Sequence, residues 1–309
     1  MKSLTMPVFY YPTQILLLDD NAIFVNNLNN ALKEKGIVGT TFTDPMAALK
    51  HVCAIPTQNP LLAALHREEH KVYEEPASEE AAWAAIRTMI ENPKRQTEIT
   101  VVIADYEMPE VPGDVFFAAF SHPYVKKIML TGRAAYEMAV KLFNQRVFNH
   151  FLVKDVHTTN DQLYAQIVEL QQRYFLDIAA PVVNALFINH PYVLGADYAQ
   201  LVEAIIQQHG IVEHYTLTKN GSKCLRDAEG RTYHLALATH EEMEGFVQTA
   251  ELSDTPEVLL QSLRERTHFP VLLTPQALSA EPARWNQYLH PAHTSVLEGQ
   301  TIYWTMVAA

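Results

Sequence analysis

The most informative part of the chain runs from Val101 to Gly113 and reads VVIADYEMPEVPG. Its first four residues are apolar without interruption, which is typical of a β-strand that is buried on both faces. Asp105 ends that run, and a Met-Pro pair and a glycine follow at short distances. This order predicts a buried strand that delivers one carboxylate to the edge of a sheet.

Comparable apolar runs occur on both sides of this stretch, and segments with helical periodicity follow them. The runs that we expect to form strands are residues 15–18, 39–43, 101–104, 128–130 and 151–153. Repeated strand–helix units are typical of a parallel sheet that has helices on both faces. We therefore predict an α/β fold with a doubly wound, five-stranded parallel sheet.

In such a sheet the carboxyl ends of the strands meet at one edge, where ligands bind. The residues at these ends are Asp19, Asp20, Asp105, Thr131 and Lys154. Clustered carboxylates repel one another unless a cation lies among them, and oxygen ligands suit Mg²⁺. An ammonium and a hydroxyl are groups that bind phosphoryl oxygens. The edge is therefore interpreted as a site for phosphoryl transfer to an aspartate.

These residues and their spacing resemble the receiver domain of response regulators in two-component signalling. An acidic pair closes the first strand, and the segment that starts at Asp105 keeps the family's D-x-x-M-P-x-x-x-G pattern. Thr131 and Lys154 follow in the family's order, with an aromatic residue, Phe151, three positions before the lysine. The resemblance covers about residues 13–176 and implies a flavodoxin-like fold.

The resemblance also implies a role for each residue. Asp105 is expected to accept the phosphoryl group from the phosphohistidine of a histidine kinase or phosphotransfer protein. Asp19, Asp20, Asp105 and the backbone carbonyl of Glu107 are expected to hold Mg²⁺ (or Mn²⁺). Lys154 is expected to pair with a phosphoryl oxygen.

Two further residues are expected to transmit the switch. Thr131 would donate a hydrogen bond to the phosphoryl group, and Phe151 would turn inward to fill the space that its movement leaves. The alternative for Phe151 is a half-buried aromatic residue with no switching role. Asp155 stands where the family commonly has proline. The usual cis peptide is not expected there, because a non-proline cis bond costs about 2.5–4 kcal/mol, and the added charge bears on the strength and lifetime of phosphorylation.

The chain also departs from the family in length. Asp20 and Asp105 lie 85 positions apart, much farther than the family's spacing, which implies an insert at about residues 55–97 before the third strand. Asn59 begins a helical pattern, and a second helix carries Trp83 on its apolar face. We expect the insert to pack on the receiver's own flank or to form a dimer or partner surface.

Composition limits the remaining possibilities. A chain of 309 residues favours two domains, which we place at residues 1–177 (receiver domain with insert) and 178–309 (output domain). Two cysteines 171 positions apart exclude a disulfide framework and fit a reducing compartment. We find no signal peptide and no segment that could span a membrane, so we expect a cytoplasmic protein without a membrane partner.

The last part of the chain predicts an α+β output domain of a type that the sequence does not identify. Helices are expected at residues 197–208, 241–249 and 256–265, and strands at 214–218, 223–225, 232–238 and 301–307. Asn220-Gly221 is expected to form a hairpin turn between the first two strands.

The charge of this domain bears on its partners. From residue 178 onward it has 7 Lys and Arg against 14 Asp and Glu residues, and no basic recognition helix is evident. The whole chain has a net charge of −12, which disfavours nucleic acid as a partner. We expect the output domain to act on a downstream protein and the chain to be no enzyme beyond its own phosphorylation and dephosphorylation. A transcription factor with an unusual DNA-binding fold, a receiver-controlled enzyme that uses its histidines, and a homodimer stay open.

Overall fold

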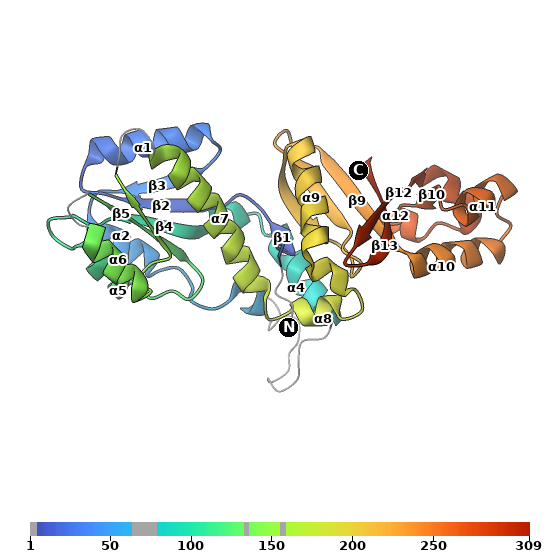
Figure 1. Cartoon of the computed structure of the whole chain (residues 1–309), viewed down its shortest axis with the longest axis horizontal. Coiled ribbons are helices and arrows are strands. Elements are labelled where there is room, and N and C mark those ends of the chain that lie inside the picture. The colour runs from blue at the N-terminus through green and yellow to red at the C-terminus, as the bar shows by residue number, and fades with distance from the viewer. Residues whose placement is uncertain (1–4, 64–78, 133–135, 155–158) are drawn as a thin grey trace. The chain divides into compact units, whose positions relative to one another are not determined.

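The computed structural model describes residues 5–63, 79–132, 136–154 and 159–309. These residues form two compact units (Figure 1). The unit that covers most of the predicted receiver resemblance, which we call the receiver unit, has its described residues within Tyr11–Glu75 and Ala84–Pro181. The described residues of the second unit fall within Met1–Tyr10, Pro76–Trp83 and Val182–Ala309. Within the described ranges, no helix has both the length and the apolar character needed to cross a membrane.

A five-stranded parallel sheet forms the centre of the receiver unit (Figure 1). Its strands are β2 (Gln14–Leu18), β3 (Val38–Phe42), β4 (Ile99–Asp105), β5 (Lys126–Thr131) and β6 (His150–Val153), in the spatial order β3-β2-β4-β5-β6. β4 lies in the middle, and all of its residues are buried, as its uninterrupted apolar run predicts. Numbered along the chain within the sheet, this is the 2-1-3-4-5 order of flavodoxin-like folds. The predicted fold class is confirmed.

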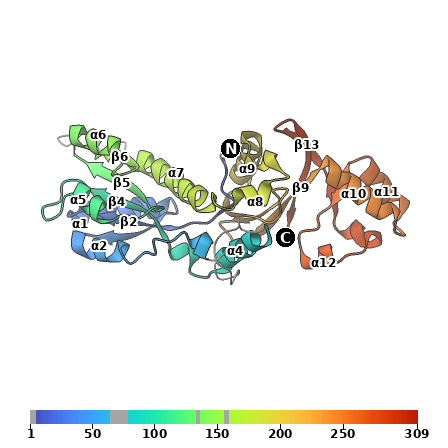
Figure 2. The ribbon, with the colours of Figure 1, turned by 90° about the horizontal axis from the view of Figure 1, so that it is seen from below.

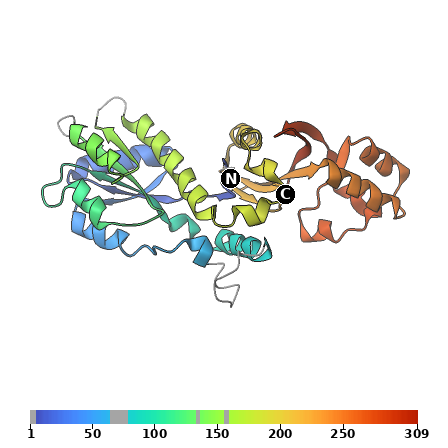
Figure 3. The same ribbon diagram turned by 60° about the horizontal axis from the view of Figure 1, so that its bottom comes forward.

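Helices cover both faces of this sheet. Successive residues of a strand point to opposite faces, so apolar residues from the strands contact helices on both sides. Ile15 and Leu17 face one set of helices, and Leu16 and Leu18 face the other. α7 runs along the sheet (Figure 3). The first face carries α1 (Ala22–Glu34) and α7 (Thr159–Ala179). The second face carries α2 (Pro45–Val52), α5 (Gly113–Ala119) and α6 (Tyr136–Asn144). A short 3-10 helix, η1 (Arg95–Thr97), precedes β4.

The structure describes the two ends of the insert. At its start the side chain of Asn59 accepts hydrogen bonds from the backbone N–H groups of Leu61 (2.9 Å) and Leu62 (3.2 Å), so the predicted helix start is confirmed. The predicted second helix is α4 (Glu79–Glu91). Trp83 packs edge-to-face on Phe187, with 6.2 Å between ring centroids. Both residues belong to the second unit, a location that neither expected arrangement of the insert included.

The second unit contains a six-stranded antiparallel sheet, a two-stranded sheet and several helices, of which α10 and α11 lie side by side (Figure 2). The predicted meander is confirmed, and Gly221 in its first turn has a positive φ of 83°, which glycine adopts without strain. The larger sheet has the order β1 (Phe9–Tyr10), β7 (Ile211–Thr216), β8 (Lys223–Asp227), β9 (Thr232–Thr239), β13 (Gln300–Ala308) and β12 (His293–Leu297), and the smaller sheet pairs β10 (His268–Pro270) with β11 (Leu289–Pro291). The helices are α8 (Val183–Phe187), η3 (Pro191–Leu194), α9 (Ala196–His209), α10 (His240–Glu251), α11 (Glu257–Arg264), α12 (Pro275–Leu278) and η4 (Pro282–Gln287).

The first strand of the chain belongs to the second unit. Phe9 pairs with Tyr215 and Tyr10 with His214, so β1 forms one edge of the six-stranded sheet. The hydroxyl of Thr5 also donates a hydrogen bond to the carbonyl of Gly195 at 2.9 Å. The boundary predicted from the sequence placed this segment in the receiver domain, because nothing in a short, mixed segment signals a partner two hundred positions away.

The second sheet contains a buried lysine. Lys223 on β8 is 1% exposed, and its Nζ donates a hydrogen bond to the hydroxyl of Thr216 at 2.7 Å. Burial lowers the pKa of Lys223 to about 7. The neighbouring His214 is also buried, and burial holds its pKa well below the usual value, so it is neutral in the same pH range. Among the residues that the structure describes, no carboxylate forms an ion pair with Lys223, so its charged form is costly.

We expect replacement of Lys223 by methionine to stabilise the protein at pH 7 by about 2–4 kcal/mol. The folded pKa is about 7 and the unfolded one about 10.4, so the unfolded chain binds more protons between these values and wild-type stability rises with pH there. The gain from Lys223→Met should therefore shrink by pH 10. Denaturant titrations at pH 7 and pH 10 measure the difference in the free energy of unfolding between the variant and the wild type. Lys219→Met, an exposed change on the same hairpin, is the control. Equal gains at both pH values would contradict the prediction.

Candidate functional site

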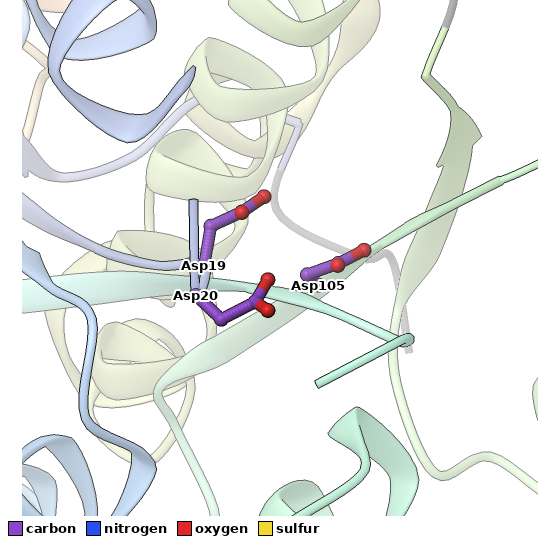
Figure 4. Close-up of side chains that lie close together, drawn as sticks. All are labelled: Asp19, Asp20 and Asp105. Atoms are coloured by element: carbon purple, nitrogen blue, oxygen red, sulfur yellow. The ribbon is translucent and has the colours of Figure 1, made fainter. Parts of the chain in front are cut away.

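Three aspartates lie together at the carboxyl edge of the receiver sheet (Figure 4). β2 ends at Leu18, so Asp19 and Asp20 extend beyond the sheet, and β4 ends at Asp105 itself. The two strands are adjacent and parallel, with Leu18 paired to Ala104. One carboxylate oxygen from each of the three aspartates lies within 4.8 Å of those from the other two. The structure therefore brings together the acidic residues that the sequence predicted to meet.

The surroundings of these carboxylates fit a cation. Asp19 and Asp105 are 2% and 3% exposed, whereas Asp20 is exposed. Oδ1 of Asp105 is buried and, among the described residues, is held only by its ion pair with Lys154. Burial raises the pKa of Asp105. A buried carboxylate oxygen of this kind is stabilised by a positive charge, and a group of hard oxygen ligands suits Mg²⁺.

Lys154 brings a positive charge to this edge. It follows β6, and its backbone N–H donates to the carbonyl of Thr131 at 2.8 Å. Its Nζ donates a hydrogen bond to Oδ2 of Asp19 at 2.6 Å and lies 2.9 Å from Oδ1 of Asp105. Burial acts to lower the pKa of Lys154, but the two carboxylates outweigh it and the pKa is raised. The ammonium also lies 4.7 Å from the ring centroid of Phe24, a cation–π contact.

The two residues expected to act as a switch lie on neighbouring strands. Thr131 ends β5, is fully buried, and donates its hydroxyl hydrogen to the carbonyl of Gly132 at 3.1 Å. Phe151 on β6 is partly buried. Its ring lies 6.0 Å from that of Phe143 and 6.2 Å from that of Phe148. In this state the hydroxyl is bonded next to its own strand end, and the aromatic ring packs against residues in and just after α6.

The chain returns close to Asp105 only because residue 113 is glycine. The N–H of Gly113 donates to the carbonyl of Tyr106 at 3.1 Å, and α5 begins at Gly113. A Cβ atom at this position would lie 2.2 Å from the carbonyl oxygen of Asp105, a distance that no side chain tolerates. Glu107 contributes its backbone N–H to the Asp105 carboxylate. The spacing between the aspartate and the glycine in the sequence pattern therefore has a steric reason.

Two residues of this site were not predicted from the sequence. The backbone N–H of Asn21 donates to Oδ1 of Asp19 at 2.9 Å, and the Asn21 side chain caps α1. An asparagine before an amphipathic helix is a recognisable capping signal, so this residue could have been found. Phe24 could not, because nothing in the sequence shows that its ring faces Lys154. Asp155 lies outside the described residues, and the expectation about it stays a prediction.

Among the residues that the structure describes, the three aspartates are the only candidate metal site of this kind. In the part of the chain that the structure describes, no other group of three or more His, Cys, Asp or Glu side chains lies close enough together to share a metal ion.

The fold and the arrangement of its edge residues define a class: the receiver unit has the fold of a response-regulator receiver domain. A solved structure that is similar over nearly the whole chain is that of the Legionella pneumophila response regulator LqsR. It is 22% identical in sequence, with a TM-score of 0.76, and the likeness covers 99% of this chain and 90% of that one.

Structures of single receiver domains are similar to part of the chain. The response regulator receiver domain protein from Clostridium thermocellum is 19% identical with a TM-score of 0.33, and the match covers 52% of this chain and 95% of that one. The receiver domain of the Francisella response regulator 1452 is 15% identical with a TM-score of 0.33, covering 52% and 98%. No protein-family model and no curated protein sequence matches the chain.

Proposed function

We propose that this chain is a response regulator of a two-component phosphorelay and that Asp105 is its phosphoryl acceptor. One observation carries the proposal. A buried aspartate at the end of the central strand forms an ion pair with the Lys154 ammonium at 2.9 Å and lies beside two further aspartates. A nucleophilic carboxylate, a fixed cation and additional oxygen ligands are the groups that phosphoryl transfer to a carboxylate requires.

The residues would share the chemistry in the following way. An oxygen of Asp105 attacks phosphorus and the P–N bond of a phosphohistidine in a histidine kinase or phosphotransfer protein breaks. The electron pair of that bond stays on the ring nitrogen, and because the other ring nitrogen carries a proton the histidine leaves as neutral imidazole. Asp19, Asp20, Asp105 and the Glu107 carbonyl would hold Mg²⁺ or Mn²⁺, which supplies positive charge to the phosphoryl oxygens when bound. Lys154 would move from the free carboxylates to a phosphoryl oxygen. It is already charged and already within reach.

The switch would follow from the same geometry. The Thr131 hydroxyl would exchange its bond to Gly132 for one to the phosphoryl group, and Phe151 would leave its contacts with Phe143 and Phe148 to occupy the vacated space. A change of charge at the edge of the sheet would then become a change in the surface formed by β6 and α6. The proposed function places the chain in the cytoplasm, and its two free cysteines agree with a reducing compartment.

Acetyl phosphate tests the proposal without a kinase. Incubation of the full chain with acetyl phosphate and Mg²⁺ should add one phosphoryl group, visible as a single adduct in the intact mass spectrum. The same incubation in EDTA should add none, because the clustered carboxylates then repel the incoming phosphate. No adduct with Mg²⁺ present, or an equal adduct in EDTA, would count against Asp105 as a metal-dependent acceptor.

The second unit is proposed to act on a downstream protein rather than on DNA. Its helix α11 carries Arg264, but this guanidinium is held by Glu251 at 2.8 Å and Glu257 at 3.1 Å. Arg266 likewise contacts Glu244. Both cations of the short basic cluster are thus neutralised by neighbouring carboxylates, which leaves little positive charge for phosphates.

We expect the full chain, with or without acetyl phosphate, to leave the mobility of duplex DNA unchanged at low salt. Phosphate contacts dominate protein–DNA affinity, and this chain offers few of them. A gel-shift series at increasing salt measures the result. Retention at low salt that falls steeply as salt is added would favour the alternative of a transcription factor with an unusual DNA-binding domain.

A further inference from the structure

The receiver unit contains a cavity at the end of the sheet opposite to the aspartates. Its volume is about 650 Å³, within the range of pockets that bind small molecules. Glu98 and Ile99, at the start of β4, form part of its wall, whereas Asp105 ends the same strand. The cavity therefore does not belong to the proposed phosphorylation site.

Most of the cavity wall is apolar. Four segments of the receiver unit contribute to it: the chain after α2 up to the start of the insert, the residues that lead into β4, the loop before β5, and α7. Ile55, Pro56, Pro60 and Ile99 line it, and Tyr174 of α7 adds an aromatic side chain that is almost fully buried. A ligand that fills this space would gain mainly from the burial of an apolar body.

Glu98 provides a hydrogen-bond acceptor within this apolar wall. Its Oε2 accepts a hydrogen bond from the hydroxyl of Tyr11 at 3.2 Å, and its backbone carbonyl accepts one from the N–H of Gln14 at 2.8 Å. Burial raises the pKa of Glu98 to about 7. Among the residues that the structure describes, no donor is bonded to the second carboxyl oxygen, Oε1. Glu98 is therefore fixed in place with one acceptor unused.

The wall on the insert side is held by specific hydrogen bonds. Nδ1 of His122 accepts from the backbone N–H groups of Tyr124 (3.2 Å) and Val125 (3.1 Å), so the ring proton lies on Nε2, which donates to the carbonyl of Pro56 at 2.8 Å. The Asn59 side chain donates to the carbonyl of Ile178 on α7 at 2.9 Å. The start of the insert is thus bonded to two other walls of the cavity. A pocket with fixed walls loses little entropy when a ligand binds.

We propose that this cavity binds a small, mostly apolar molecule whose polar head, an amine or a hydroxyl group, donates a hydrogen bond to Glu98. Beside the half-buried Glu98 a carboxylate head would meet a like charge, and a molecule with no polar head would leave the Glu98 oxygen without a donor. Lys94 also lines the cavity, so a carboxylate that bound as tightly as the amine would point to Lys94 rather than to Glu98. The ligand would contact the strand that carries the phosphoryl acceptor and the helix α7. The inference does not depend on the proposed function, because it uses none of the residues of the phosphorylation site.

Four probes that share a phenyl group and differ in their polar group show which polar group the cavity prefers. They are 2-phenylethylamine, 2-phenylethanol, ethylbenzene and 3-phenylpropanoate. Binding to the full chain is measured by saturation-transfer NMR and by perturbation of backbone amide shifts. We expect the amine and the alcohol to bind with Kd of about 1 mM or tighter, as befits ligands of this size, and ethylbenzene and 3-phenylpropanoate to bind at least about tenfold more weakly.

Two variants locate the site. Glu98→Gln should weaken the binding of 2-phenylethylamine by about tenfold or more, because a charge-assisted hydrogen bond is lost. Ala54→Trp places a bulky side chain at an exposed position that lines the cavity. It should weaken the binding of every probe that binds the wild type. Glu34→Gln and Ala47→Trp, both at exposed positions on other surfaces of the same unit, are the matched controls and should change nothing. The proposal is overturned if no probe binds, if 3-phenylpropanoate binds as tightly as the amine, or if Ala54→Trp leaves the Kd of the amine unchanged.

Discussion

Asp105→Asn is expected to reduce phosphorylation by acetyl phosphate to background, a loss of about 100-fold or more, because the amide oxygen is not a nucleophile under these conditions. The fold should persist. Asp105 is a buried carboxylate whose pKa is raised by burial, so its replacement by a neutral side chain of the same shape removes a costly buried charge. Lys154 keeps its hydrogen bond to Asp19 at 2.6 Å.

Intact-mass spectrometry after incubation with acetyl phosphate and Mg²⁺ measures the loss, and circular dichroism verifies the fold. Asp161→Asn is the matched control, since it makes the same chemical change to a side chain that is 88% exposed and that, among the described residues, forms an ion pair only with Lys35. This control should be phosphorylated like the wild type. An adduct of equal size on Asp105→Asn, or its loss from Asp161→Asn, would contradict the assignment.

Gly113→Ala is expected to destabilise the receiver unit by about 1–3 kcal/mol and to slow phosphorylation by about 10–100-fold. The added Cβ would lie 2.2 Å from the backbone oxygen of Asp105 and 2.9 Å from Sδ of Met129. Met129 is flexible, but the strand backbone is held by its neighbours on both sides, so either α5 or the acceptor strand must move. A displacement of the acceptor by a fraction of an ångström disturbs its alignment with Lys154.

Thermal unfolding and the initial rate of adduct formation test both parts of this prediction. Gly245→Ala is the control. Gly245 lies inside α10, where an added Cβ would have no neighbouring atom within 4 Å, so alanine there should stabilise the helix by up to about 1 kcal/mol. If Gly113→Ala behaved like Gly245→Ala, the steric explanation of the sequence pattern would be wrong.

The receiver fold could be predicted from sequence because its signals are local. β4 is buried along its whole length, so its residues are almost continuously apolar, and its carboxyl end is marked by the first charged residue. In parallel sheets such ends share an edge, which is why Asp19, Asp105 and Lys154 could be placed together from the sequence. The hairpin at Gly221 was predictable for a similar reason, since only a few residues tolerate a positive φ.

The parts that could not be predicted depend on contacts between distant positions. Helical spacing shows that Trp83 lies on an apolar face but does not say that the face meets Phe187. The ring of Phe24 near Lys154 and the unused oxygen of Glu98 are likewise products of packing. Neither leaves a periodic or compositional signal in the chain.

The position of β1 has a consequence for how the protein is made. Its residues are synthesised before the receiver unit, whereas their partner strand, β7, is synthesised only after it. During translation this short segment must wait as an unpaired tail, and β7 would have an open edge in any fragment that starts at residue 178. Such a fragment exposes backbone groups that invite pairing with another molecule, so aggregation of the excised output half would say little about the intact protein. A bulky group attached directly to β1 would disturb the sheet of the second unit, to which β1 belongs.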